Sequence, residues 1–144
     1  SDHAGFELKE KLEKALGDLG YDVQDLGTNS ADSTDYADYA HPLAEHVSNG
    51  DVKRGVLLCG TGLGMSYAAN RHPHVRAAVA WSPEIAKLAR EHNDANVLVL
   101  PARFVDEEQG VAILKTWLET KFEGGRHARR VDKIELDSET DQAK

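Results

Sequence analysis

The stretch Gly55-Val-Leu-Leu-Cys59, followed directly by Gly60-Thr-Gly-Leu-Gly64, decides the fold of this chain. A short run that is apolar at every position is typical of a strand covered on both faces, as in a parallel sheet. The alternate glycines predict a tight turn, and the small residues that follow, through Asn70, predict a helix. We therefore predict a strand, a turn and a helix here, which is one step of an α/β fold.

Along the rest of the chain, helical patterns and strand patterns also follow one another. Leucines at 8, 12, 16 and 19 recur at helical spacing before Gly20, and 21–26 (YDVQDL) alternates like a strand. Further helices are predicted over 36–48, 83–92, 106–122 and 126–136, and further strands over 76–81 and 96–100. This order predicts a parallel sheet with helices on both faces. Because a strand normally precedes the first helix of such a fold, we expect the printed chain to lack the start of its first strand.

Composition narrows the class of protein. The 144 residues suit one domain, which we expect over 1–136, with a solvated C-terminal tail over 137–144. The 17 Lys and Arg residues against 25 Asp and Glu residues give a net charge of −8, which argues against nucleic acid and membrane surfaces as partners. The single cysteine, Cys59, excludes an intrachain disulfide and favours a cytoplasmic location. No apolar run approaches the roughly 18 residues of a membrane span.

The cysteine and its glycine turn are the strongest candidate site. Ligands of open α/β sheets bind beyond the carboxyl ends of the strands, where Cys59–Gly64 is expected. Its backbone N–H groups and the following helix start could hold a phosphate or an oxyanion, and they favour the thiolate. Met65-Ser66 replaces the Lys-Ser of a P-loop, and the glycine spacing does not fit a dinucleotide fingerprint. On spacing alone, a buried structural cysteine beside a tight turn explains the pattern equally well.

Two histidine motifs are further candidates. Asp2-His3 is expected at the same edge, either as an acid–base or phosphate-binding pair or as a helix cap with a surface histidine. His92-Asn93 ends a predicted helix, where catalysis and an ordinary helix C-terminus are equally good explanations. The remaining histidines at 41, 46, 72 and 74 have no spacing that indicates a metal site.

The basic stretch near the C-terminus is the exception in an acidic chain. Arg126 and Arg130 lie four residues apart, so they share a helix face and could bind one phosphate together. A solvated helix face is the alternative. We favour a small anionic ligand because the charge is concentrated in one segment.

These motifs together resemble the type B ribose-5-phosphate isomerases, a family that also includes the galactose-6-phosphate isomerase subunits. They follow the family's order over nearly the whole chain. The matching stretches are Ser1-Asp-His-Ala-Gly5, Thr34-Asp-Tyr36, Cys59-Gly-Thr-Gly-Leu-Gly-Met65 with Ala68-Ala-Asn70, Glu91-His-Asn-Asp-Ala-Asn-Val97, and Glu123-Gly-Gly-Arg-His127 with Arg130-Val131.

The resemblance implies a Rossmann-like three-layer α/β/α sandwich that forms a homodimer or a tetramer of dimers, with the active site at the dimer interface. It implies no metal and no organic cofactor. The implied reaction interconverts D-ribose 5-phosphate and D-ribulose 5-phosphate through a cis-enediol. Six-carbon substrates such as allose or galactose 6-phosphate are an alternative, as is a non-catalytic phosphosugar-binding module.

The resemblance also implies roles for single residues. Cys59 matches the base that moves the proton, and Met65 stands where part of the family has a glutamate instead. Thr61 and the amides of the turn would hold the enediolate oxygen. The turn glycines concerned are Gly60, Gly62 and Gly64.

The other matched residues would bind the sugar and its phosphate. Asp2 and Tyr36 would contact sugar hydroxyls, and His92, with Asn93 beside it, would assist ring opening. The expected phosphate contacts are His3, Arg126 and Arg130, with Arg103 offered across the interface. The chain departs from the family where Ala37 replaces a proline and where Pro101-Ala102 replaces a glycine-rich turn before Arg103.

Overall fold

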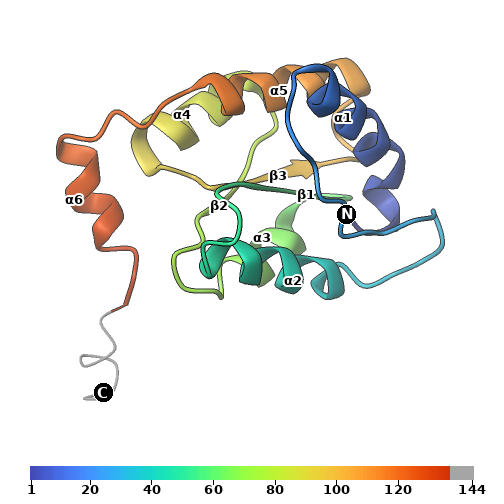
Figure 1. Ribbon diagram of the computed structural model, residues 1–144, viewed down its shortest axis with the longest axis horizontal. Coiled ribbons are helices and arrows are strands. Elements are labelled where there is room, and N and C mark those ends of the chain that lie inside the picture. The colour runs from blue at the N-terminus through green and yellow to red at the C-terminus, as the bar shows by residue number, and fades with distance from the viewer. Residues whose placement is uncertain (137–144) are drawn as a thin grey trace.

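The centre of the fold is a parallel three-stranded sheet, seen in a computed structural model that describes residues 1–136 (Figure 1). The strands lie in the order β1 (Gly55–Cys59), β3 (Val97–Pro101) and β2 (Ala77–Val79). β1 and β3 pair along their whole lengths, from Gly55 with Val97 to Cys59 with Pro101. Cys59 therefore lies at the carboxyl edge of the sheet. The predicted tail over 137–144 lies outside the described residues.

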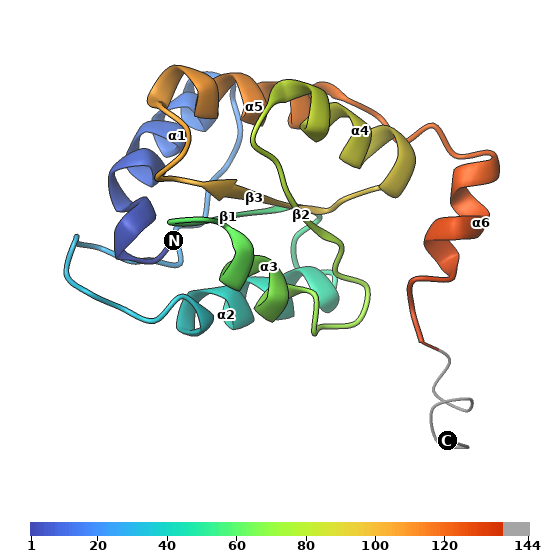
Figure 2. The ribbon, with the colours of Figure 1, turned by 180° about the vertical axis from the view of Figure 1, so that it is seen from behind.

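Helices cover both faces of the sheet (Figures 1 and 2). One face carries α1 (Phe6–Asp18), α4 (Pro83–Asn93) and α5 (Glu107–Glu119). The other carries α2 (Ala37–Ser48) and α3 (Leu63–Ala69), while α6 (Arg126–Asp132) lies to one side, beyond α4. A short 3₁₀ turn, His3–Gly5, precedes α1. This arrangement confirms the predicted three-layer α/β/α sandwich.

The central strand explains why its sequence is apolar at every position. Successive side chains of a strand point to opposite faces. Leu98 and Leu100 of β3 join the cluster under α1 and α5, which contains Trp117, while Val97 and Val99 join the cluster under α2 and α3. All five positions of β3 are buried. Each layer therefore has its own core, and β3 belongs to both.

Side-chain caps set where two of the helices begin. Ser82 precedes Pro83 of α4, and its hydroxyl accepts a hydrogen bond from the Ile85 N–H at 3.3 Å. α5 begins with a capping box, in which Asp106 accepts from the Gln109 N–H at 2.7 Å and Gln109 accepts from the Asp106 N–H at 2.9 Å. Such caps satisfy the N–H groups that a helix start leaves free.

One predicted strand is absent. Residues 22–26 form no backbone hydrogen bond with the rest of the described chain, although 21–26 alternates as a strand should. A groove lies between this segment and β1. A strand needs a neighbour with which it exchanges backbone hydrogen bonds, so the local pattern alone was insufficient and the prediction was wrong.

The other predicted elements are present, several with shorter ends. β2 covers three residues rather than 76–81, α5 ends at Glu119 rather than 122, and α6 ends at Asp132 rather than 136. The longest helices described, α1 and α5, have 13 residues each. None of the helices in residues 1–136 is long and apolar enough to cross a membrane.

Candidate active site

The turn after β1 bends back so that one of its backbone N–H groups donates to a thiol. Cys59 is 4% exposed, and the Gly62 N–H donates a hydrogen bond to its Sγ at 3.2 Å. Gly62 has a φ of 80°, a left-handed conformation that glycine adopts without strain. A Cβ at this position would lie 3.2 Å from Cγ1 of Val79. Glycine at 62 is therefore required both by the conformation and by the close packing on the sheet.

Asp2 is held directly beside this strand end. Its N–H donates to the carbonyl of Leu58 at 3.2 Å, and its carboxylate accepts from the Ala4 N–H at 3.0 Å. Gly5 permits the approach, because a Cβ there would lie 2.6 Å from Cβ of Leu58. Asp2 is only 6% exposed. A buried carboxylate thus lies next to the strand that ends in the thiol.

His3 is fixed by two reciprocal hydrogen bonds with Thr34. The His3 N–H donates to Thr34 Oγ1, and the Thr34 N–H donates to Nδ1 of His3, both at 3.1 Å. Since Nδ1 accepts a hydrogen bond, the neutral ring carries its proton on Nε2; the tautomer is assigned from this bond. The other ring nitrogen is therefore a donor, as a phosphate contact requires.

Tyr36 and Arg103 border the glycine turn from two sides. A Cβ on Gly64 would lie 2.6 Å from Cζ of Tyr36, so the ring lies directly over that glycine. The Arg103 N–H donates to the carbonyl of Gly60 at 3.1 Å, and its side chain lies against the same glycine. The Arg103 side chain thus contacts the turn of its own chain, and its role across a dimer interface stays a prediction.

Thr61 is exposed on this turn, and its Oγ1 accepts a hydrogen bond from the Leu63 N–H at 3.2 Å. Together these residues form what we call the carboxyl-edge group. Its members are Asp2, His3, Tyr36, Cys59, Thr61 and Arg103 with the turn glycines. One chain brings all of them together.

The remaining predicted residues lie elsewhere in the chain. α4 leads from the carboxyl end of β2 back to the amino end of β3, so His92 and Asn93 lie toward the amino edge of the sheet. α6 packs beside α4, at the side of the molecule away from α1 (Figures 1 and 2), and presents Arg126 and Arg130 to solvent. We call His92, Asn93, Arg126 and Arg130 the α4–α6 group. One chain does not bring this group to Cys59.

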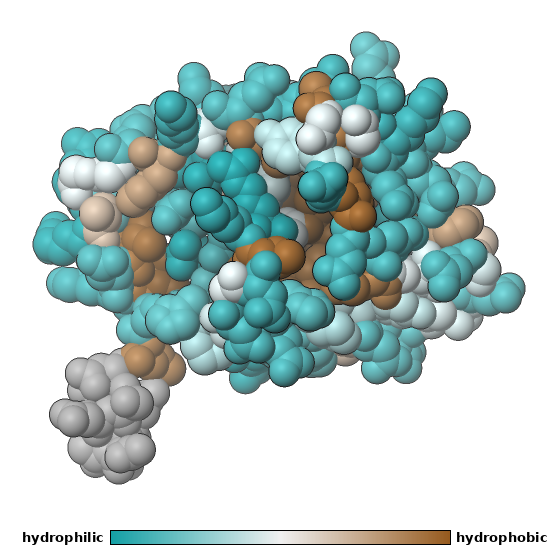
Figure 3. Space-filling model, viewed as in Figure 1, coloured by the Kyte–Doolittle hydropathy of each residue, from teal (hydrophilic) through white to brown (hydrophobic). Residues whose placement is uncertain are grey.

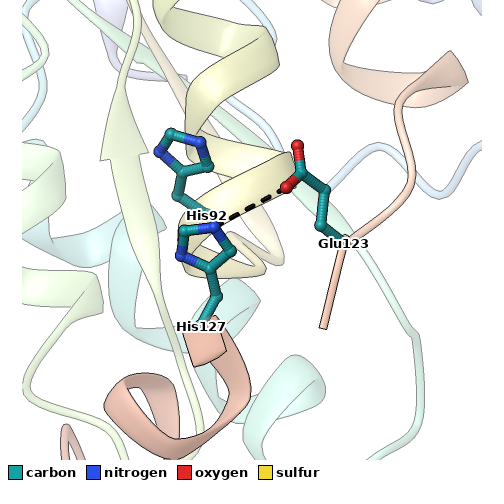
Figure 4. Close-up of side chains that lie close together, drawn as sticks. All are labelled: His92, Glu123 and His127. Atoms are coloured by element: carbon teal, nitrogen blue, oxygen red, sulfur yellow. Dashed lines mark ion pairs between the residues drawn. The ribbon is translucent and has the colours of Figure 1, made fainter. Parts of the chain in front are cut away.

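A histidine that the sequence reasoning did not select ties α6 to α4. The rings of His127 and His92 stack with centroids 4.4 Å apart and an interplanar angle of 15° (Figure 4). His127 is 7% exposed, and its Nε2 lies 3.6 Å from Oε2 of Glu123. A hydrogen bond with Glu91 and an electrostatic interaction with His127 lower the pKa of Glu123. The spacing of four between Glu123 and His127 was the available sequence signal.

Two clusters of side chains have the proximity that a metal ion needs. Among residues 1–136 these are His92, Glu123 and His127, and Glu10, Glu13 and Asp25, each with ligand atoms within 4.8 Å of one another. The second cluster surrounds Lys9, whose ammonium pairs with Asp25 and Glu10. The first already contains a histidine–carboxylate pair and a ring stack. Neither cluster includes a member of the carboxyl-edge group.

The fold and the two groups define an α/β protein with a thiol at the edge of its sheet and a separate cationic helix. The chain belongs to the Ribose/Galactose Isomerase family, whose model matches residues 1–134. It is 45% identical over 133 residues to ribose-5-phosphate isomerase B of Escherichia coli (strain K12), covering 92% of this chain and 89% of that protein.

Solved structures agree with this membership. A ribose 5-phosphate isomerase from Thermotoga maritima has 51% identity and a TM-score of 0.91, covering 94% of this chain and 93% of that one. Ribose-5-phosphate isomerase B from Mycoplasma genitalium, solved with bound ribulose-5-phosphate, has 44% identity and a TM-score of 0.89. That match covers 93% of this chain and 90% of the other.

Proposed function

We propose that this chain is an aldose–ketose isomerase that interconverts D-ribose 5-phosphate and D-ribulose 5-phosphate in the pentose phosphate pathway. The observation that carries the proposal is the family membership, shared with the Mycoplasma genitalium enzyme that was solved with ribulose-5-phosphate. The thiol and the glycine turn of this chain supply the chemical groups that such a reaction needs.

Cys59 is the proposed base. In the forward direction its thiolate takes the proton from C2 of the open-chain aldose, which lies next to the C1 carbonyl. The electron pair of that C–H bond forms the C1–C2 double bond of a cis-enediolate, while the electron pair of the C1 carbonyl moves onto O1. A proton then passes from the C2 hydroxyl to O1, and the thiol returns its proton to C1 as the C2 carbonyl forms, which gives the ketose and regenerates the thiolate. Such general acid–base transfer requires a group held at the reacting carbon. The hydrogen bond from the Gly62 N–H to Sγ supports this role, because it holds the sulfur within the turn.

The negative charge that develops on the substrate oxygen needs donors in fixed positions. We assign this role to the N–H groups of the turn at Gly60 and Gly64 and to the Thr61 hydroxyl, with the Gly62 N–H, bonded to Sγ of Cys59 in the free chain, joining them only if it turns from the sulfur to the substrate oxygen. The turn is held in place, because the backbone N–H of Arg103 donates to the Gly60 carbonyl and the Tyr36 ring lies over Gly64. Asp2 and Tyr36 would contact the sugar hydroxyls from either side.

The full site requires a second copy of the chain. His92, with Asn93, would assist ring opening, and Arg126 and Arg130 would join His3 and Arg103 at the phosphate. Since the α4–α6 group lies away from Cys59 in its own chain, the proposal places it in the site of a partner copy. We therefore propose a homodimer, or a tetramer of dimers, as the active form, located in the cytoplasm and using no cofactor.

The direct test is an isomerase assay in D₂O, followed by NMR. The substrates compared are ribose 5-phosphate, allose 6-phosphate and galactose 6-phosphate. Conversion of ribose 5-phosphate to ribulose 5-phosphate, with deuterium entering the substrate carbon, is the expected result. Faster turnover of a six-carbon substrate would replace the substrate assignment. Because galactose enzymes of the family pair two unlike subunits, activity of this chain alone would argue against galactose 6-phosphate. Binding without deuterium incorporation would identify a non-catalytic module.

A further inference from the structure

The contact between α4 and α6 gathers two imidazole rings and a carboxylate at one point (Figure 4). His92 comes from the last turn of α4, His127 from the start of α6, and Glu123 from the segment that joins α5 to α6. One ligand atom of each lies within 4.8 Å of the other two. We call these three residues the His–Glu cluster. Imidazole nitrogens and a carboxylate oxygen are ligands of Zn²⁺ in three-ligand sites, which keep a fourth position for water.

The backbone holds the three side chains close together. The Glu123 N–H donates to the Glu91 carbonyl at 3.1 Å, which ties the segment before α6 to the end of α4. The His127 side chain is only 9% exposed, and its Nε2 lies 3.6 Å from Oε2 of Glu123. Ligand atoms around a tetrahedral zinc ion lie roughly 3.3 Å apart, so closing the cluster on an ion requires shifts of at most about 1.5 Å. A site that is nearly formed in advance loses little conformational entropy when it binds.

The ring stack is the part of the cluster that an ion would change. The lone pair of an imidazole nitrogen lies in the plane of its ring, and the planes of His92 and His127 differ by only 15°. Two nitrogens that bind one ion must point toward a common centre, so the rings have to tilt. His92 is only partly buried, which leaves its ring room to do so.

The charge around the cluster favours a cation. The side chains of Glu123 and Glu91 form a hydrogen bond, which two carboxyl groups can share only when one of them holds a proton. When both are ionised, they repel each other. The fixed positive charges nearby are Lys87, whose exposed ammonium lies 3.8 Å from Glu91, and Arg126, which acts on Glu123. A divalent ion beside Glu123 would remove the repulsion without protonating either carboxylate.

The other cluster with this proximity, formed by Glu10, Glu13 and Asp25, differs in two respects. It offers carboxylates alone, and the ammonium of Lys9 already pairs with two of its members. Of the two clusters in residues 1–136, the His–Glu cluster is therefore the one that combines nitrogen ligands with unneutralised carboxylates.

Solvent reaches the His–Glu cluster. Hydrophilic residues predominate on the surface at the side of the molecule that carries α6 (Figure 3), and the Glu123 side chain is 49% exposed. A dissolved ion can therefore enter, and water can complete its coordination.

We propose that the His–Glu cluster is an inhibitory zinc site, in which His92, Glu123 and His127 bind Zn²⁺. The inhibitory role rests on the proposed function, which assigns ring opening to His92. A nitrogen of His92 that binds zinc cannot exchange a proton with the sugar, so the metal lowers isomerase activity and is not a cofactor. The ion also joins the end of α4 to the start of α6, which stabilises the folded chain.

The first experiment measures zinc binding by isothermal titration calorimetry. Every chain carries Cys59→Ala, because the only thiol of the protein is itself a zinc ligand. We expect one Zn²⁺ per chain, and we expect His127→Gln and Glu123→Gln each to weaken binding about tenfold or more. Glu123 is half exposed, so its substitution keeps the test valid if His127→Gln fails to fold.

The matched control is His72→Gln. It removes one ring of the other close histidine pair, in which Nδ1 of His41 and Nε2 of His72 are 2.8 Å apart. We expect this control to bind zinc as the parent chain does. The zinc site would be refuted by the absence of one-to-one binding, or by binding that His72→Gln weakens and Glu123→Gln does not.

A second experiment tests the inhibitory role in chains that keep Cys59. Zinc should inhibit the isomerase reversibly, with activity restored by EDTA, and Glu123→Gln should need about tenfold more zinc for the same inhibition. Equal inhibition of the two chains would contradict this role. The calorimetric experiment does not depend on activity, so zinc binding at the cluster of an inactive chain would refute the proposed function and leave the zinc site standing.

Discussion

The carboxyl-edge group and the α4–α6 group are held in place by different means. The first is held by backbone hydrogen bonds at strand ends and by glycines that allow close approach, and its thiol and carboxylate are buried. The second is built on a short helix attached through a ring stack, and its two arginines are exposed. This difference agrees with the proposed homodimer, in which each chain would hold its thiol rigidly and present its exposed arginines to the other copy.

The largest effect is expected at the thiol. Cys59→Ala should lower kcat about a thousandfold, because it removes the proposed base while leaving the phosphate contacts, so KM should change little. Steady-state kinetics with ribose 5-phosphate would measure this, with circular dichroism and thermal unfolding as controls for the fold. Activity close to that of the unaltered chain would remove Cys59 from the mechanism.

Mixing two inactive variants tests whether the carboxyl-edge group of one chain and the α4–α6 group of another form one active site. Cys59→Ala and His92→Ala chains, unfolded together in equal amounts and refolded, should form mixed dimers with one intact site each. Statistical pairing then predicts recovery of about a quarter of the original activity. If each chain forms its own complete site, the mixture stays as inactive as its components. Size-exclusion chromatography would verify that dimers form.

Arg126 should affect binding more than turnover. Loss of a charge-assisted hydrogen bond to phosphate predicts that Arg126→Ala raises KM about 10- to 100-fold with a smaller change in kcat. Arg129→Ala is the matched control, since it removes the same charge from an exposed position of the same helix. Equal effects of the two substitutions would indicate general electrostatic attraction rather than a specific contact.

The smallest expected effect tests the rigidity of the carboxyl edge. Gly5→Ala places a Cβ 2.6 Å from Cβ of Leu58, and such overpacking should lower the free energy of unfolding by about 1–3 kcal/mol. Gly17→Ala is the control, because nothing lies within 4 Å of its added Cβ. Within helix α1 that change should stabilise the chain by about 0.5–1 kcal/mol. Equal responses would show that Gly5 does not limit the approach to β1.

Much of the fold could be predicted from the sequence because its signals are local. The apolar run of β1, the glycine turn and the caps of α4 and α5 each act within a few residues. Segment 21–26 could not be predicted, because a strand depends on a neighbour that its own pattern does not contain. The partners of His3 and His92 were likewise hidden, since Thr34 and His127 reach them only through the fold.

The candidate site residues also differ in whether their positions follow from local sequence or from the fold. Cys59 and the turn glycines follow from one continuous motif, so their proximity could be predicted directly. The separation of His92 from Cys59 depends instead on the direction of α4, which leads from one edge of the sheet to the other. Motifs in the right order therefore indicate candidate site residues, but not which of them the fold of one chain brings together.

The hydrogen bond from the Thr34 N–H to Nδ1 of His3 attaches the loop that precedes Tyr36 to the histidine ring. An imidazolium has a hydrogen on both nitrogens and accepts no hydrogen bond. The ring can therefore hold the Thr34 amide only in its neutral form, whereas the second bond, from the His3 backbone N–H to Thr34 Oγ1, does not involve the ring. The loop that leads into Tyr36 is thus attached to His3 at two places, and only one of them depends on the form of the ring.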